Sequence, residues 1–164
     1  MESNSVETAI TDQHVYPVLI IGAGQGGFQA AASLRQDGFA GRIVLIGEEA
    51  GLPYQRPPLS KAWLKGEADA DSLALKPADW YAQNNVSLRL EGVAERINRA
   101  EKTVILASGE VIAYDALILA TGARARELPI PGSDLAGVLA LRTAADAELL
   151  KHALGPDKRL AVIG

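Results

Sequence analysis

Short, almost wholly apolar runs alternate with a helical pattern in the first part of the chain. Val18–Ile21 and Arg42–Ile46 consist mainly of β-branched residues and leucine, which is typical of parallel strands buried on both faces. Between them, apolar residues recur at helical spacing over Gln25–Asp37, and Gly38 fits the end of that helix. Ala116–Leu119 is a further apolar run of the first kind. The pattern predicts an α/β fold built on a parallel sheet.

The remaining patterns predict shorter elements, including an inserted β-meander. The expected helices are Leu59–Lys65, Pro77–Asn84 and one starting at Thr143; the expected strands are Val86–Leu90, Val93–Asn98, Lys102–Ala107, Glu110–Ala113, Gly137–Leu141 and Arg159–Gly164. Ser108-Gly109 is the expected hairpin turn of the meander. Residues 66–72 are expected to be loose, and Thr143 and Asp146 are spaced like a capping box.

A glycine-rich turn joins the first predicted strand to the first predicted helix. Gly22 permits the tight turn, Gly24 lets the backbone approach a pyrophosphate, and Gly27 lets the helix pack closely on the strand. Gln25 and Gly26 lie at the start of the helix, whose amides and dipole face the expected phosphate site. The turn alone is a weak signal, because an ordinary tight turn also uses glycines. Its strand–turn–helix context favours a nucleotide-binding fingerprint.

An acidic residue ends the second predicted strand. Glu48 lies 21 residues after Gly27, where a carboxylate can accept both hydroxyls of an adenosine ribose. The alternative is a solvated acid beside Glu49. The stretch from Pro17 to Glu48 therefore predicts an adenine dinucleotide, and by itself it fits NAD as well as FAD.

Composition excludes several classes of protein. The 164 residues are 48% hydrophobic and 22% charged, as in ordinary globular domains, and the net charge of −4 disfavours a nucleic-acid partner. Without cysteine there is no disulfide, thiolate metal site or redox dithiol; we assign no metal-ligating residue and expect a bound cofactor to carry any electron chemistry. With no signal-peptide pattern and no apolar run of membrane-spanning length, we expect a cytoplasmic protein.

Five motifs occur together and in order. They are Gly-Ala-Gly-Gln-Gly-Gly (22–27), Ile-Gly-Glu-Glu (46–49), Pro-Tyr-Gln-Arg-Pro-Pro-Leu-Ser-Lys (53–61), Tyr-Asp-Ala-Leu-Ile-Leu-Ala-Thr-Gly (114–122) and Leu-Arg-Thr-Ala-Ala-Asp-Ala (141–147). Together they resemble the FAD-dependent NAD(P)H:ferredoxin reductases, the NADH-oxidising components of bacterial Rieske dioxygenase and cytochrome mono-oxygenase systems. The resemblance covers residues 17–164 and corresponds to the N-terminal part of such an enzyme. The segment around 56–61 is its narrowest motif.

The resemblance implies a set of FAD-binding residues. These are Gly22, Gly24, Gln25, Gly26 and Gly27 at the pyrophosphate, Glu48 at the ribose, Arg56 and Lys61 beside the flavin, Ala94 at the adenine, Ala120, Thr121 and Gly122 along the cofactor, and Arg142 at the domain junction. Lys61 is the candidate catalytic residue, because a cation near the N5 edge favours a reduced anionic flavin. The implied partners are NADH as electron donor and a ferredoxin as acceptor.

The resemblance also divides the chain. With the sequence patterns, it gives a flexible tail (1–16), the first segment of a Rossmann-like FAD-binding domain with a parallel sheet and inserted meander (17–122), a crossover (123–135), and the start of a second Rossmann-like domain for NAD(P)H (136–164). The strand and glycine at the end of the sequence fit the beginning of a second fingerprint. Because a nicotinamide site cannot be built from that beginning alone, we expect the 164-residue chain by itself to be inactive.

Two alternatives remain open. The chain can be a non-catalytic FAD- or ADP-binding fragment, or part of a related flavin reductase with another electron acceptor. Without the family resemblance, Arg56 and Lys61 are simply surface cations on a proline-containing loop.

Overall fold

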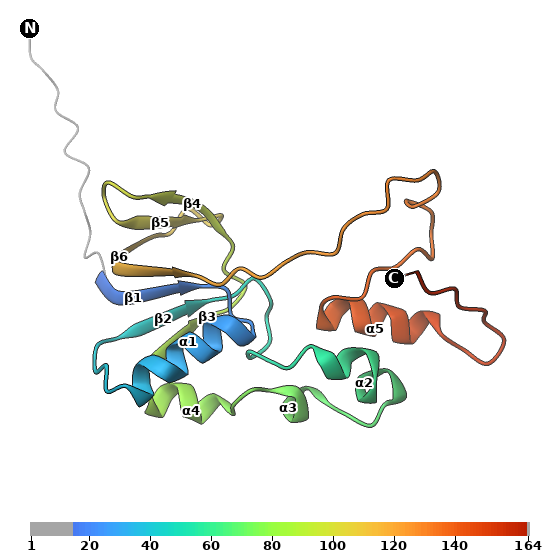
Figure 1. The fold of residues 1–164 in the computed structure, drawn as a ribbon, viewed down its shortest axis with the longest axis horizontal. Coiled ribbons are helices and arrows are strands. Elements are labelled where there is room, and N and C mark those ends of the chain that lie inside the picture. The colour runs from blue at the N-terminus through green and yellow to red at the C-terminus, as the bar shows by residue number, and fades with distance from the viewer. Residues whose placement is uncertain (1–14, 164) are drawn as a thin grey trace, which may run out of the picture.

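The computed structural model describes residues 15–163, which form a six-stranded sheet with helices on one face and a further helical part at its edge (Figure 1). The strands are β1 (Val15–Ile21), β2 (Ile43–Ile46), β3 (Val86–Arg89), β4 (Ala94–Asn98), β5 (Thr103–Leu106) and β6 (Val111–Leu119). The helices are α1 (Gln25–Gln36), the 3-10 helix η1 (Pro57–Ser60), α2 (Ala62–Lys65), α3 (Ala70–Leu73), α4 (Ala78–Gln83) and α5 (Ala144–Ala153).

The strand order β3-β2-β1-β6-β5-β4 confirms the predicted α/β class with an inserted meander. β1 lies in the middle and pairs in parallel with β2 and β6, while β5 pairs antiparallel with β6, and β4 pairs antiparallel with β5. The predicted strands at 110–113 and 116–119 are one continuous strand, β6. β1 begins at Val15, two residues before the expected domain start, and residues 1–14 of the predicted tail lie outside the described part.

The two faces of the sheet carry separate apolar clusters, as strand alternation requires. On one face, Ile20 and Leu45 pack against Phe28 and Ala31 of α1 and Tyr81 of α4. The opposite face packs residues of β1 and β2 against the meander; its buried members are Leu19, Ile21, Val44, Ile46, Val104, Leu106, Ile112 and Tyr114. The sheet thereby fixes the ends of β1, β2 and β6 relative to one another.

An aromatic cluster joins α1 to α4. The ring of Phe28 lies 5.3 Å from that of Trp80 and 6.2 Å from that of Tyr81, centroid to centroid. The Tyr81 hydroxyl is buried and makes no hydrogen bond within the described residues, and burial raises the pKa of Tyr81 to about 12. This hydroxyl has lost its hydration without gaining a partner, which costs stability.

We expect Tyr81→Phe to stabilise the fold by about 1 kcal/mol near neutral pH, because the unsatisfied hydroxyl is removed while the ring stays. Folded Tyr81 keeps its proton above pH 10, where the unfolded tyrosine releases its own. The free energy of unfolding therefore falls between pH 10 and about 12, and Tyr81→Phe reduces this loss. Urea unfolding at pH 7 and pH 11 measures both effects. A clear loss of stability at pH 7 would show that the hydroxyl has a bonding partner.

A second, smaller cluster lies beside the sheet, where η1 and α2 meet α5 (Figure 1). Leu59, Leu73 and Ala147 are its buried members, and Trp63 packs against them. α5 begins at the predicted capping box: Asp146 N donates to Thr143 Oγ1 at 3.1 Å. The cluster ties the proline-containing segment to the start of α5.

Three local predictions are wrong. Residues 66–72 are not uniformly loose, because Asp69 caps α3 through Ser72. Residues 137–141 and 159–163 form no strand, although their patterns are strand-like, and Gly164 lies outside the described part. A strand needs a pairing partner for its backbone, and none of the described strands pairs with these segments. Their side chains are accordingly exposed; Val138 is 50% exposed and Val162 82%.

The predicted burial of residues 116–119 is only partly correct. Leu117 and Ile118 pack against the two clusters of the sheet, whereas Ala116 is exposed and Leu119 has 62% of its surface exposed. The strand itself is as predicted, because β6 pairs with β1 along its length.

Candidate dinucleotide-binding site

The carboxyl ends of β1, β2 and β6 meet at one edge of the sheet. Gly22 N donates to Ile46 O at 2.8 Å, and Ala120 N donates to Ile21 O at 2.8 Å. In doubly wound sheets, ligands bind at this edge, where the chain crosses from one side of the first strand to the other. The structure thus brings the predicted glycine turn, Glu48 and Ala120 to a single edge.

The glycines of the turn have different steric roles. Gly22 has φ of +113°, and a Cβ there would lie 2.1 Å from Ala120 O. A Cβ on Gly27 would lie 1.9 Å from Gly22 O, so this position also excludes a side chain. A Cβ on Gly24 would meet nothing within 4 Å. Packing therefore requires Gly22 and Gly27, whereas the open space at Gly24 is what the approach of a ligand requires.

The first turn of α1 is available to an anion. Gly24 is the N-cap and supplies no capping side chain, and the turn contains no acidic residue. Gln25 and Gly26 are exposed. In contrast, α3 and α5 have side-chain capping boxes. Uncapped amides at the positive end of a twelve-residue helix fit a pyrophosphate.

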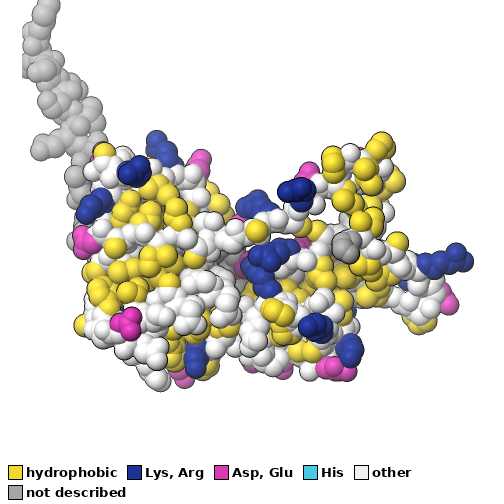
Figure 2. All heavy atoms as spheres, in the orientation of Figure 1, with side chains coloured by type: hydrophobic (Ala, Val, Ile, Leu, Met, Phe, Trp, Pro, Cys, Tyr) yellow, Lys and Arg dark blue, Asp and Glu magenta, His cyan; other side chains and the backbone are white. Residues whose placement is uncertain are grey.

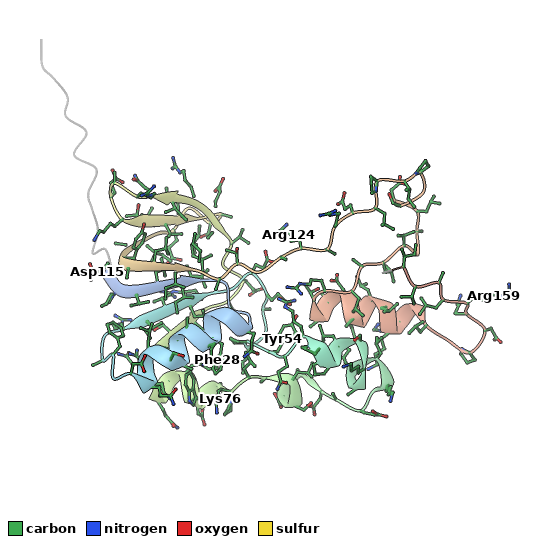
Figure 3. All side chains as sticks on the ribbon, viewed as in Figure 1. Phe28, Tyr54, Lys76, Asp115, Arg124 and Arg159 are labelled. Carbon is green, nitrogen blue, oxygen red and sulfur yellow. The ribbon has the colours of Figure 1, made fainter. Side chains whose placement is uncertain are left out.

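Glu48 follows β2 at the same edge and has 54% of its side chain exposed. Its Oε2 lies 3.2 Å from Nη2 of Arg124, and Figure 3 places Arg124 on the segment that leaves β6. Glu48 is thus directed to the place where strand order reverses. Its carboxylate can accept ribose hydroxyls there, and it would repel a ribose phosphate.

The start of the meander reaches the same edge through Gly92. Gly92 N donates to Gly47 O at 2.9 Å, and a Cβ on Gly92 would lie 3.0 Å from Ile46 Cγ2. Ala94, two residues later, opens β4 and packs partly against the core cluster. The contact of Ala94 with adenine stays a prediction.

The proline-containing segment is connected to the strand edge by three polar side chains. Arg56 Nη2 lies 2.7 Å from Glu49 Oε1, and Tyr54 OH donates to Glu49 Oε2 at 2.7 Å. Figure 3 shows Tyr54 between the end of the sheet and α5. A pocket of about 260 Å³ opens beside these residues; its lining is Arg56, Pro57, Leu59, Ser60, Leu141 and Arg142.

The predicted cation at the domain junction lies beside the end of β6. Arg142 Nη2 would be 3.7 Å from a Cβ on Gly122, and Arg142 Nε donates to Ala123 O at 3.1 Å. Thr121 and Gly122 are exposed. Lys and Arg side chains gather between the sheet and the α5 part in Figure 2. The geometry thus joins Arg142 to the Thr121-Gly122 turn, which the sequence predicts as a cofactor contact.

Lys61 lies between η1 and α2 and is exposed. Its backbone N donates to Pro58 O at 2.9 Å, but its ammonium makes no hydrogen bond or ion pair within residues 15–163. Lys61 is therefore held at the segment by its backbone, and its charged group is left available to a ligand.

Two pKa shifts accompany the site. Burial and the hydrogen bond to Glu49 raise the pKa of Tyr54 to about 12, so its hydroxyl remains a donor across the physiological range. Burial alone would raise the pKa of Asp146, but the amides of Thr143 and Arg142, the Thr143 hydroxyl and the charge of Arg56 hold it below its usual value. Asp146 therefore stays an anion that caps α5 and holds the backbone of Arg142.

Sequence reasoning missed Glu49, Tyr54 and Arg124 as polar members of this region. In the sequence, Tyr54 is only a part of the motif at 53–61, and Glu49 is only the residue after Glu48. Arg124 could have been found, because it comes shortly after a strand whose carboxyl end lies at the predicted site. No sequence pattern predicts the Glu49–Arg56 ion pair, since this pair depends on the path of an irregular loop.

A doubly wound sheet with a glycine turn at its switch point is the architecture of Rossmann-like nucleotide-binding domains. The chain belongs to the pyridine nucleotide-disulphide oxidoreductase family, whose model matches residues 16–164. None of the helices formed by residues 15–163 is long and apolar enough to cross a membrane.

Relatives and solved structures confirm the predicted resemblance to ferredoxin reductases. The chain is 50% identical over 147 residues to rhodocoxin reductase of Rhodococcus erythropolis, covering 90% of this chain and 34% of that protein. It is 42% identical over 150 residues to putidaredoxin reductase of Pseudomonas putida, covering 90% and 36%. The chain thus spans about a third of the length of these relatives.

Among solved structures, the ferredoxin reductase for the CYP199A2 system from Rhodopseudomonas palustris matches with a TM-score of 0.78 and 47% identity, over 82% of this chain and 33% of that one. The reductase in a covalent putidaredoxin reductase–putidaredoxin complex matches with a TM-score of 0.80 and 41% identity, over 87% and 35%. The Rossmann-like architecture predicted from the sequence is confirmed.

Proposed function

We propose that this chain is the FAD-binding N-terminal part of an NAD(P)H-dependent ferredoxin reductase. The observation that carries the proposal is the convergence of the glycine turn, Glu48 and the Arg56–Lys61 segment on one edge of the sheet, joined there by the Glu49–Arg56 ion pair. Relatives of the chain are named as rhodocoxin, putidaredoxin, rubredoxin and ferredoxin reductases. The domain limits 17–122, 123–135 and 136–164 belong to this proposal.

The residues at the edge fit FAD. The open space at Gly24 and the uncapped first turn of α1 suit a pyrophosphate, and Glu48 suits the ribose next to it. When bound, the flavin accepts two electrons from NADH and releases them one at a time. The role of this chain is to hold the adenosine and pyrophosphate and to place Lys61 and Arg142 as cations toward the flavin end.

The relatives, and the absence of cysteine from this sequence, support the proposed electron acceptor. Without a dithiol in the sequence, electrons cannot leave through a disulfide of this chain. The dioxygenase reductase components and putidaredoxin reductase among the relatives support a ferredoxin as partner. A rubredoxin reductase at 44% identity supports the alternative of another small iron protein. A cytoplasmic location, expected from the sequence patterns, belongs to the same proposal.

Purification of the intact protein tests the proposal. We expect visible flavin absorption, release of FAD on denaturation, and NADH oxidation coupled to reduction of one member of a panel of oxidised ferredoxins and rubredoxins. A colourless protein that takes up no added FAD would overturn the proposal. The 164-residue polypeptide serves as the comparison: NADH oxidation at the rate of the intact protein would contradict the assignment of the chain as an N-terminal part.

Glu48→Gln should weaken FAD binding about tenfold, because the neutral amide replaces a charged acceptor of two ribose hydroxyls. Fluorescence titration of the flavin-free protein with FAD measures the change, and titration with ADP assigns it to the adenosine half. Glu110→Gln is the matched control, since Glu110 is another half-exposed glutamate with an arginine partner, 3.9 Å from Arg89. Equal affinities for the two variants would remove Glu48 from the site.

A further inference from the structure

Glu49, Tyr54 and Arg56 form a closed set of contacts, which we call the clasp. Arg56 Nη2 lies 2.7 Å from Glu49 Oε1, and Tyr54 OH donates to the other carboxylate oxygen at 2.7 Å. Arg56 Nη1 donates to Tyr54 OH at 3.2 Å, and the guanidinium carbon lies 5.2 Å from the centre of the tyrosine ring. Each polar group of the clasp is therefore engaged with the other two.

The clasp also holds the start of the α5 segment. Arg56 Nη1 donates to Arg142 O at 2.7 Å, and Tyr54 OH accepts from Ala144 N at 2.9 Å. Arg142 N donates to Asp146 at 2.9 Å, so the backbone of Arg142 is held on both sides. These contacts join residues that are 86 and 90 positions apart in the chain. They fix the position of the Arg142 backbone, and hence the point from which its side chain extends.

The same arginine fixes the segment that bears Lys61. Arg56 is the N-cap of η1, and Lys61 is the residue at which η1 ends and α2 begins. The side chains of Arg56 and Glu49 are only 30% and 28% exposed. A ligand that bound Arg56 directly would have to compete with this partly buried, doubly hydrogen-bonded carboxylate.

We propose that the clasp positions Arg142 and the Lys61 segment at the cofactor edge, and that Arg56 acts through these contacts instead of binding the cofactor itself. The inference rests on the proposed function, because it assigns roles within the FAD site. It makes Glu49 and Tyr54 positioning residues for a site that neither of them touches. Disturbing the clasp then displaces two cations that favour the reduced, anionic flavin.

The test compares Glu49→Gln, Arg56→Gln and the double variant in the intact FAD-bound protein. We expect each single variant to weaken FAD binding about tenfold, and the double variant to be no weaker than either, because both changes open the same set of contacts. The midpoint potential of bound FAD should become more negative in all three. Glu110→Gln, which alters a glutamate far from the clasp in the sequence, should change neither quantity.

A direct role for Arg56 gives a different pattern. Glu49→Gln would then free the guanidinium and leave FAD binding unchanged or tighter, while Arg56→Gln alone weakens it; this result would overturn the inference. An additive double variant, or an unchanged potential in Glu49→Gln, would also overturn it. The potential is informative because a loss of stability alone does not change the relative energies of oxidised and reduced flavin.

Tyr54→Phe provides a milder variant and a readout without flavin. It removes the acceptor of the Ala144 amide, so amide hydrogen exchange at Ala144 should become faster in the flavin-free protein. Unchanged exchange would overturn the clasp. If the wild-type protein bound no FAD, the proposed function would fall, and this exchange experiment would still decide whether the clasp holds the α5 segment.

Discussion

Gly27→Ala is expected to remove the folded structure around α1. A Cβ at this position would lie 1.9 Å from Gly22 O and 3.0 Å from Leu45 Cδ1. The obstacle is the backbone of the glycine turn, which cannot move away as a flexible side chain can. We expect a loss of about 3 kcal/mol or more, a large part of the stability of an ordinary domain. Urea unfolding and amide exchange in β1 and α1 of the flavin-free protein measure it.

Gly24→Ala is the matched control for Gly27→Ala. Gly24 has φ of −86°, which any residue adopts, and a Cβ there meets nothing within 4 Å. We expect a loss of less than about 1 kcal/mol, the usual cost of alanine at an N-cap. FAD binding should nevertheless weaken at least about tenfold, because the methyl group occupies the approach of the pyrophosphate. Wild-type FAD affinity in Gly24→Ala, or an unchanged unfolding midpoint in Gly27→Ala, would contradict this separation of roles.

The parts of the fold that sequence predicted well depend on local patterns. β1, α1 and β2 form within three residues of their predicted limits, because the apolar runs, the glycine turn and helical spacing all lie within a short stretch. The strand-like run 137–141 shows the limit of such reasoning. Residues 137–141 have the apolar pattern of a strand. Whether such a run forms a strand also depends on a neighbouring strand that can hydrogen-bond to its backbone.

Some residues of the candidate site could likewise be predicted from local sequence patterns, and others could not. The positions of Gly22, Gly24, Gly27 and Glu48 follow from motif spacing along one βαβ unit. The clasp does not, because Arg56 meets Arg142 across 86 residues through the path of an irregular loop. A single sequence contains no signal for a contact of that kind.

The contacts of Arg35 also could not be predicted from the sequence. Its sequence position suggests only a basic residue in the last turn of α1. In the structure its guanidinium donates to four carbonyl oxygens. Those of Phe39 and Gly41 belong to the turn before β2, and those of Asn84 and Asn85 to the turn before β3. Asn85 has a left-handed backbone with φ of +50°, and its carbonyl also accepts from Ile43 N at 3.4 Å. Arg35 therefore joins the entrances of two neighbouring strands.

We expect Arg35→Met to destabilise the flavin-free protein by about 3 kcal/mol, because the charged donor is lost and partly buried carbonyls remain without it. Arg35→Lys should recover only part of this, since a single ammonium cannot replace the planar group at four acceptors. Urea unfolding gives the energies, and faster amide exchange at Ile43 should locate the change at the entrance of β2.

Arg126→Met is the matched control for Arg35→Met, because Arg126 is exposed and makes no hydrogen bond or ion pair within the described part of the chain. A loss in Arg35→Met no larger than in Arg126→Met would show that the four contacts contribute little. The effect of Arg35 should also reach the nucleotide edge, since β2 carries Glu48 at its other end. Because FAD binds only the folded protein, saturating FAD should restore part of the stability that Arg35→Met loses.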